Sequence, residues 1–245
     1  MSEFKFPTEV IELPSKGLVY PKDNPLSSGK VEIKYMTAKE EDILSNQSYI
    51  QKGVVLDKLL ESVMIDSSPK DLIVGDKNAI LVATRILGYG KDYKITVNSE
   101  SHVLDLTTLE NKEFDGSLIE ENKNEFKYKL PNTGTEITFK ILDGHDEYKI
   151  NKELEGLKKV SKNPPELSTR LKHMITSVNG DAESKTIRDF VENYLLAMDS
   201  RSLRSYIREV QPDLNLVTTL DNGEEVRVPL GLDFFWPEYS GGAII

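Results

Sequence analysis

Cysteine is absent from this chain, and histidine occurs only three times. Without cysteine, no disulfide and no thiolate zinc site can form, and this composition suits a reducing compartment. The histidines (His102, His145 and His173) are never four residues apart, as two metal ligands on one helix face would be. The acidic stretch 143–147 could hold a cation, but we interpret it as the solvated start of a helix. We therefore predict no metal site and no cofactor.

Long apolar runs are also missing. The most apolar window, Ala79–Leu87, contains Thr84 and Arg85 and is far shorter than the roughly 18 apolar residues that a membrane helix needs. Residues 1–7 lack the apolar stretch of a secretory signal. We predict no membrane partner, and we expect the chain to stay in the cytoplasm in which it is made.

Known catalytic motifs are a third absence. The chain contains no G-x-S-x-G, no H-E-x-x-H and no nucleotide-binding fingerprint. The glycines of Leu87–Lys91 follow a predicted helix, whereas a phosphate loop follows a strand and opens a helix. A turn that ends the helix is the better interpretation. The sequence gives no support for an enzyme or for a small-molecule substrate.

Positive charge is scarce, because 41 acidic residues outnumber 31 basic ones and the formal net charge is -10. Broad binding to nucleic acid needs clustered lysine and arginine, so we do not expect nucleic acid as the main partner. Arg201, Arg204 and Arg208 are a local exception, since their spacing places them on one helix face. This face is either a solvated surface or a site for an acidic protein. A nucleic-acid-binding or regulatory adaptor that uses these arginines is the alternative function.

The 245 residues, 38% of them hydrophobic, are enough to bury a sizeable core. The hydrophobic periodicity changes along the chain and predicts an α+β fold, with two mainly helical parts flanking an inserted small antiparallel β module. The predicted segments are an extended Pro/Gly-rich arm with a strand (1–35), a helical part (36–90), the β module (91–142), a second helical part (143–212), and a β hairpin with an aromatic tail (213–245).

Local signals predict the individual elements. Thr37 and Glu40 form the capping box of a helix, and Asp76 is a candidate N-cap for a buried central helix that ends before Gly88. Hairpins are expected to pair residues 125–130 with 136–141 and residues 216–220 with 225–228. Further helices are expected at 152–160, 164–178 and 186–198, followed by one that Asp199 or Ser200 caps.

Two segments near the chain ends are candidate partner-binding regions. The arm forms a tight turn between extended pieces, with the candidates Leu13, Pro14, Tyr20 and Pro21. The tail is aromatic, with the candidates Phe234, Phe235, Trp236 and Pro237. A single chain has few residues left to cover aromatic side chains near its terminus. They either fold back into the protein's own core or anchor a partner, as tryptophan often does.

Several stretches in the first ninety residues and at the C-terminus are distinctive. They are LPSKGLVYP (13–21), EIKYMTAKEEDIL (32–44), LDKLL (56–60), DLIVGDKNAI (71–80), RILGYG (85–90) and FFWP (234–237). Together they resemble the small baseplate hub proteins of T4-like contractile-tailed bacteriophages. The resemblance is weak in the β module.

That resemblance implies a tail protein that takes part in building the central hub of the baseplate, as a structural subunit or as an assembly chaperone. The implied partners are other phage baseplate hub proteins. The implied location is the host cytoplasm during assembly and, for a retained subunit, the virion tail. Some relatives carry cysteine pairs that suggest a zinc ribbon. The matching stretch here, Val97–His102, has no cysteine, so thiolate zinc binding does not carry over.

Overall fold

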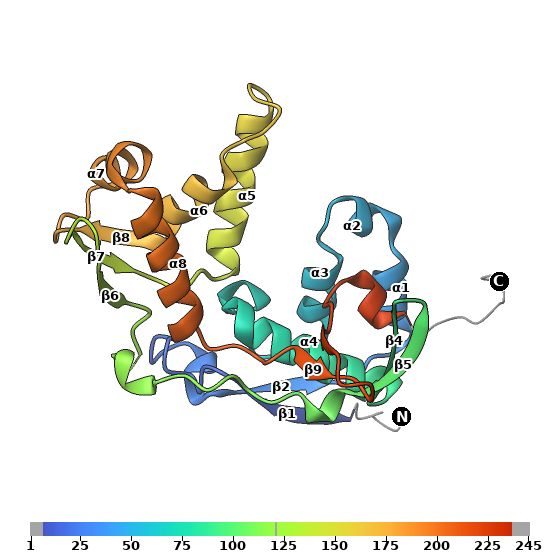
Figure 1. Ribbon diagram of the computed structural model, residues 1–245. Coiled ribbons are helices and arrows are strands. Elements are labelled where there is room, and N and C mark those ends of the chain that lie inside the picture. The colour runs from blue at the N-terminus through green and yellow to red at the C-terminus, as the bar shows by residue number, and fades with distance from the viewer. Residues whose placement is uncertain (1–6, 121, 237–245) are drawn as a thin grey trace.

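The computed structural model describes residues 7–120 and 122–236. The protein is α+β, as predicted, and its helices and small antiparallel sheets form two lobes (Figure 1). One lobe contains most of residues 7–105, and the other contains residues 126–210. The chain then returns to the first lobe, so the two ends of the described sequence share one lobe (Figure 1).

The first lobe starts from a three-stranded antiparallel sheet. Its strands, in spatial order, are β1 (Thr8–Glu12), β2 (Lys30–Lys34) and β3 (Met64–Ile65). Val31 and Ile33 of β2 are buried while Lys30 and Glu32 are exposed, so this strand, expected within residues 1–35, has one buried face and one exposed face. Four helices complete the lobe: α1 (Ala38–Ser45), α2 (Gln47–Gln51), α3 (Val55–Val63) and α4 (Val74–Tyr89). The capping box predicted at Thr37 and Glu40 opens α1.

Helix α4 starts and ends at residues that the sequence did not predict. It begins at Val74, so Asp76 is the third helical residue and not the N-cap. It ends at Gly90, whose φ of 85° only glycine adopts without strain. Gly88 has another role, because a Cβ at this position would overlap Met36 Cε. The helix therefore runs past the predicted end, and Gly88 allows Met36 to pack against it.

The predicted β module is two separate sheets. The hairpin of β4 (Asp92–Val97) and β5 (Glu100–Asp105) pairs with no other strand among the described residues. The other strands form a second sheet in the order β6 (Phe126–Lys129), β7 (Glu136–Phe139) and β8 (Ile175–Val178). Strand β8 lies where a helix was predicted. Its residues pair with β7, with Ile175 opposite Phe139, and this burial outweighs the local helical pattern.

The second lobe packs its helices against this second sheet. They are α5 (Gly144–Lys158), α6 (Glu166–Met174), α7 (Ser184–Asp189), a π-helical turn (Phe190–Tyr194) and α8 (Ala197–Val210). The single helix predicted for residues 186–198 is wrong in its second half. The Leu195 amide donates to the Phe190 carbonyl at 2.8 Å, a wider turn than in an α-helix, and Leu196 is extended.

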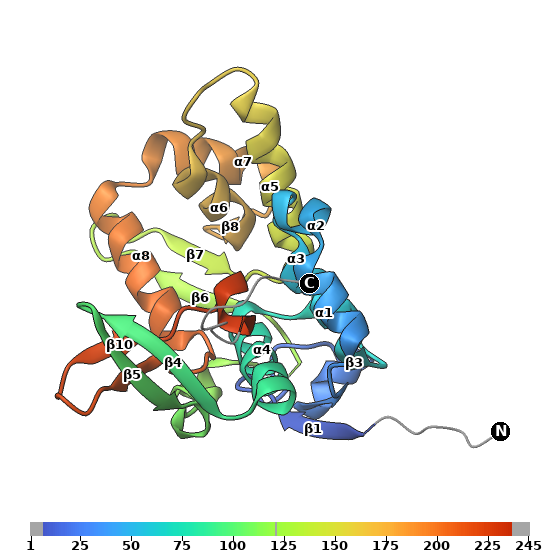
Figure 2. The same ribbon diagram turned by 90° about the vertical axis from the view of Figure 1, so that its right-hand side faces the viewer.

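The last elements return to the first lobe. Strands β9 (Val217–Thr219) and β10 (Glu225–Arg227) form the predicted hairpin, whose turn contains Gly223 at a φ of 83°. This hairpin lies beside the β4–β5 hairpin (Figure 2), and Asn98 donates to Glu224 at 3.4 Å. The chain then forms a 3-10 turn, η6 (Leu232–Phe235), which contacts α4. Other 3-10 turns lie at Pro25–Ser28, Pro69–Asp71, Leu106–Thr108 and Gly116–Leu118.

One large hydrophobic cluster extends from Leu13 to Phe235 and includes residues of both lobes. A second small cluster holds Leu142, Ile150 and Leu154 beneath α5. None of the helices within the described ranges combines the length and the apolar character that crossing a membrane requires.

Four carboxylates are buried in the described chain, and all occupy the third position of a helix. They are Glu40 in α1, Asp76 in α4, Asp146 in α5 and Asp199 in α8. A carboxylate in the first turn interacts favourably with the positive end of the helix dipole and with free backbone amides. Each also reaches a segment outside its own helix, so these four acids fix the starts of the helices to the rest of the fold.

Candidate functional site

Helix α8 has one buried and one exposed face. Leu203, Ile207 and Val210 are buried against the lobe, whereas Arg201, Arg204 and Arg208 are exposed, as the sequence predicted. Arg204 Nε donates to the Ser200 carbonyl at 3.2 Å. The Arg201 and Arg208 side chains have no hydrogen bond or ion pair with any described residue. Two guanidinium groups are therefore available to an external partner.

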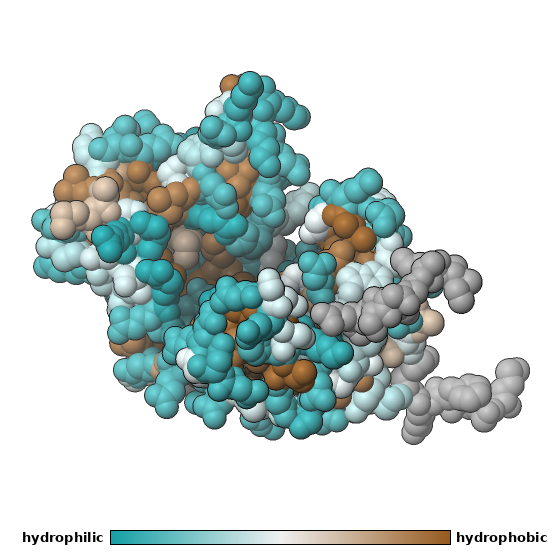
Figure 3. Space-filling model, turned by 45° about the vertical axis from the view of Figure 1, so that its right-hand side comes forward, coloured by the Kyte–Doolittle hydropathy of each residue, from teal (hydrophilic) through white to brown (hydrophobic). Residues whose placement is uncertain are grey.

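Exposed apolar side chains lie immediately before these arginines. Tyr194, Leu196 and Met198 are 63%, 52% and 71% exposed. No other five-residue stretch of the described chain has three large hydrophobic side chains this exposed. Hydrophobic surface is visible on the second lobe in Figure 3. We call the six side chains of Tyr194, Leu196, Met198, Arg201, Arg204 and Arg208 the α8 surface.

The sequence pattern did not reveal the apolar half of the α8 surface. Tyr194 and Met198 continue the spacing of Ile187, Phe190 and Val191, so a straight helix would bury all five. The π-helical turn and the extended Leu196 rotate Tyr194 and Met198 outward instead. The nearest local signal is the N-cap predicted at Asp199 or Ser200, and it is displaced: α8 begins at Ala197, so Asp199 is its third residue and the break lies about one turn earlier than predicted.

The start of α8 is fixed by Asp199. One carboxylate oxygen accepts from the backbone amide and the side-chain amide of Asn132, at 2.9 and 2.8 Å, and the other accepts from the Thr133 amide at 3.1 Å. Burial alone would raise the pKa of Asp199, but these donors outweigh it and lower the pKa. The turn between β6 and β7 therefore positions the end of α8 that carries Met198.

The other end of α8 is held by Lys112. Its ammonium group donates to the carbonyl oxygens of Arg208, Glu209 (2.9 Å) and Gln211 (3.2 Å). A cation at the C-terminal carbonyls is favourable with respect to the helix dipole. Burial lowers the pKa of Lys112. Both ends of α8 are thus tied down, and the α8 surface is presented on a rigid element.

The candidate residues of the N-terminal arm lie mostly inside the protein. Leu13, Pro14 and Tyr20 are buried, and only Pro21 is exposed. They cannot contact a partner while the arm is folded in this way. The prediction that these three residues form a partner-binding surface is corrected here, because they form part of the protein's own core.

A buried polar cluster explains why the arm is held so firmly. The carboxylate of Asp76 accepts from the Ser15 amide at 2.9 Å, from the Ser15 hydroxyl at 2.6 Å and from the Tyr20 hydroxyl at 2.5 Å. The Tyr20 oxygen in turn accepts from the Ile73 amide at 3.2 Å. Burial raises the pKa of Asp76 and, together with the nearby Asp76 charge, raises that of Tyr20. This cluster joins the N-terminal arm to the first turn of α4.

The aromatic tail is also core. Phe234 and Phe235 are fully buried, Trp236 is half-buried against the main cluster, and Pro237 lies outside the described residues. Phe234 packs against Tyr93 with ring centroids 5.1 Å apart. Of the two interpretations of the tail, the fold supports the one in which it covers its own domain. Phe234 and Phe235 are therefore corrected from interface anchors to core residues.

Arg85 of α4 explains how the tail is held. Its Nε donates to the Phe234 carbonyl at 3.0 Å, and a terminal nitrogen donates to the Gly90 carbonyl at 2.9 Å. The guanidinium also lies over the ring of Tyr89, 5.2 Å from its centroid. Burial lowers the pKa of Arg85. One buried arginine thus joins α4, the end of that helix and η6.

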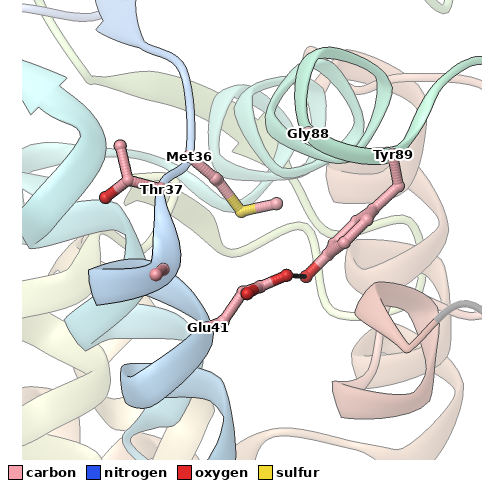
Figure 4. A pocket seen from close by; sticks show the side chains of 6 residues that line it. Met36, Thr37, Glu41, Gly88 and Tyr89 are labelled. Carbon is pink, nitrogen blue, oxygen red and sulfur yellow. Dashed lines mark hydrogen bonds between the residues drawn. The ribbon is translucent and has the colours of Figure 1, made fainter.

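A small pocket of about 170 Å³ lies between the start of α1 and the end of α4 (Figure 4). Met36 and Tyr89 point into it from opposite sides, and the Tyr89 hydroxyl donates to Glu41 at 3.3 Å. Thr37, Ala38 and Gly88 complete its lining. The lining of this pocket has one carboxylate, Glu41, and no lysine, arginine or histidine.

The three histidines are spread over the fold. His145 bonds to Asp71 at 2.9 Å, His173 bonds to Glu153 at 3.0 Å, and His102 lies on β5. Within the described ranges, no three acidic or histidine side chains converge in a way that could hold a metal ion. The acidic stretch at 143–147 is the N-cap and first turn of α5, which therefore starts earlier than the helix predicted from residue 152, and Asp143 and Asp146 form a capping box there.

Comparison with known proteins adds no relative: no protein-family model, no curated protein and no solved structure matches this chain.

Proposed function

We propose that this protein works by binding another protein through the α8 surface, and that it serves in the assembly of a phage tail baseplate hub. The observation that carries the first part is the run of three exposed side chains, Tyr194, Leu196 and Met198, which lies just before and at the start of a helix that is fixed at both ends. Apolar and aromatic side chains beside arginine are the composition found at the centres of protein interfaces.

The charge distribution supports an acidic partner for this surface. Residues 143–212 contain 12 basic and 12 acidic residues, so their formal net charge is zero, whereas the rest of the chain carries the entire charge of -10. Complementary charge speeds encounter and disfavours wrong partners. The three arginines would therefore direct an acidic protein to the second lobe, while the acidic first lobe would repel it.

The second part of the proposal, the baseplate hub, rests on the resemblance of stretches within residues 13–90 and of residues 234–237 to small hub proteins of T4-like phages. Several of the resembling residues are buried, among them Leu13, Tyr20, Asp76 and Phe234. The Tyr20 hydroxyl donates to Asp76, and the Phe234 carbonyl accepts from Arg85. The resemblance thus rests on residues that build the first lobe, whereas the proposed partner-binding residues of the α8 surface belong to the second lobe. In this proposal the protein acts in the host cytoplasm, either as a transient chaperone or as a subunit kept in the virion tail.

Co-expression with the other hub proteins of the same phage tests the proposal. The triple variant Leu196→Ser, Met198→Ser, Arg201→Glu should lose most of the co-purified partner, because it removes apolar contact area and reverses a charge. A control with the same chemistry, Val103→Ser, Val160→Ser, Arg227→Glu, alters exposed residues elsewhere and should bind normally. Equal binding by wild type and both variants would rule out the α8 surface.

Mass spectrometry of purified virions then separates the two roles. A structural subunit is present at a fixed ratio to other tail proteins, whereas a chaperone is absent from the particle. Tight DNA binding that weakens steeply with salt would instead favour the nucleic-acid adaptor.

A further inference from the structure

A groove lies in the second lobe, separate from the α8 surface. It has a volume of about 290 Å³ and is formed by α5, the end of α6, the start of β8 and α7. Its lining is mainly charged and consists of Lys140, Asp146, Lys149, Glu153, Lys172, His173, Ile175, Ser184, Ile187 and Arg188.

Cations outnumber anions in this groove. The lining contains four cations, Lys140, Lys149, Lys172 and Arg188, and two carboxylates, a formal excess of two positive charges before His173 is considered. Of these cations, Lys172 also pairs with Glu192, outside the lining, at 3.0 Å. The excess is notable in a chain whose formal net charge is -10. A concave site with one sign of charge concentrates ions of the opposite sign.

Both carboxylates are already engaged. Asp146 is 4% exposed and bonds to Lys140 at 2.6 Å, and it also belongs to the capping box of α5. Glu153 accepts from His173 at 3.0 Å and lies 3.5 Å from Lys172. Burial alone would raise the pKa of Glu153, but these cationic partners outweigh it and lower the pKa, so the carboxylate stays ionised.

Two cations remain open to a ligand. Lys149 is 62% exposed and makes only a 3.7 Å contact with Asp146. Arg188 is exposed and forms no hydrogen bond or ion pair with any residue that the structure describes. Ile175 and Ile187 are buried between these polar walls. The groove therefore combines free positive charge at its rim with apolar atoms in its lining.

We propose that this groove binds the carboxylate side chains of an acidic peptide segment on a partner protein. A glutamate or aspartate can place its carboxylate on Arg188 and Lys149 and its methylene carbons near Ile175 and Ile187. Phosphate sites commonly use free amides at a helix N-terminus. The first turn of α5 is already occupied by Asp143 and Asp146, which makes a phosphate a poorer fit. The inference uses none of the six residues of the α8 surface and does not depend on the proposed function.

The test is a titration of the full chain, at constant ionic strength, with a peptide of alternating glutamate and alanine whose two ends are chemically blocked. Binding is monitored by the changes in amide chemical shifts in NMR spectra. We expect saturable shifts around Arg188, His173 and Lys149. The variant Lys149→Ala, Arg188→Ala should weaken binding roughly threefold to tenfold, the effect of losing two exposed charge pairs.

The matched control is Lys94→Ala, Arg227→Ala, which removes the same two side-chain types from exposed positions in the other lobe. It should bind the peptide as wild type does. Shifts that rise without saturation, equal weakening in both double variants, or tighter binding of inorganic phosphate than of the peptide would each overturn the proposal. The melting temperatures of both double variants are measured as a check on folding. If they equal that of the wild type, a loss of binding is not caused by a loss of folding.

Discussion

The Tyr20 hydroxyl connects the N-terminal arm to the start of α4. It donates to Asp76 and accepts from the Ile73 amide, and Asp76 also holds Ser15 of the arm. A buried polar group left without its partner costs more than a hydrogen bond normally contributes, because the group has lost its water without replacement. This cluster therefore makes a single tyrosine important for stability although it lies far from the α8 surface.

We predict that Tyr20→Phe lowers the free energy of unfolding by about 1–3 kcal/mol. The Ile73 amide would lose its acceptor, and one oxygen of Asp76 would lose one of its two hydroxyl donors. Urea denaturation followed by circular dichroism measures the change. Tyr148→Phe is the matched control, because Tyr148 is 66% exposed. Equal stability of the two variants would show that the hydroxyl of Tyr20 is not needed.

Glu40 predicts a specific pH dependence. Burial alone would raise its pKa, but hydrogen bonds from Ser62, Thr37 and Lys34 outweigh burial and lower the pKa from 4.5 to about 2. Because the folded-state pKa is the lower one, the ionised carboxylate stabilises the fold above pH 4.5. This contribution is lost as the pH falls from 4.5 towards 2.

Glu40→Gln should therefore be less stable than wild type at pH 7, by on the order of 2 kcal/mol, and the difference should shrink towards pH 2. Urea unfolding at several pH values checks this. A stability difference that stays constant over the whole range would contradict the role of the charge.

The sequence predicts some of these residue roles and not others. Thr37 and Glu40 are three residues apart, so their capping box follows from local spacing. The partners of Asp76 are 56 and 61 residues away, and no local pattern indicates such a contact. The same limit applies to Phe234 and Phe235, whose burial depends on Arg85 and Tyr93 of the folded first lobe.

Among the elements, the C-terminal turn η6 is held against the first lobe by one side chain of α4, that of Arg85. The Arg85 guanidinium carries both the bond to the Phe234 carbonyl and the bond to the Gly90 carbonyl. Lysine has neither the length nor the forked geometry to make both bonds. The last residue of the turn, Phe235, directly precedes Trp236, and Trp236 is the single tryptophan of the chain.

Arg85→Lys should loosen η6 before the rest of the protein unfolds. We expect a red shift of tryptophan fluorescence and stronger quenching by acrylamide under conditions where circular dichroism is unchanged. Arg201→Lys alters an exposed arginine and should leave the fluorescence as it is. Identical quenching of the wild-type and Arg85→Lys proteins would refute this anchoring.

The elements with local signals agree with prediction, and those fixed by distant pairing do not. The turn Asp221–Gly223 predicts the β9–β10 hairpin directly. By contrast, β8 becomes a strand only because Ile175 and Val178 pair with β7. The break between α7 and α8 interrupts a hydrophobic spacing that continues through Met198, so the sequence favoured one helix there. That break creates the candidate surface, which explains why half of it was missed.

The whole molecule is electrically asymmetric. Residues 126–210 of the second lobe contain 15 basic and 13 acidic residues, a formal net charge of +2, whereas the rest of the chain carries -12. The second lobe carries both the α8 surface and the charged groove. Repulsion between acidic first lobes opposes self-association, while the second lobe remains accessible to an acidic partner. This arrangement suits a protein whose work is to recognise another protein with a defined orientation.

Site-specific photo-crosslinking in cells that express the chain together with phage baseplate hub proteins, its proposed partners, tests this account most directly. A photoreactive amino acid at position 196 or 198 should cross-link to one defined baseplate hub protein, identified by mass spectrometry. The same probe at position 103, which is comparably exposed in wild type as Val103 at 58%, should not. Cross-links to the same protein in equal yield from all three positions, or no hub protein cross-linked from 196 and 198, would contradict the claim that the α8 surface is where this molecule binds its partner.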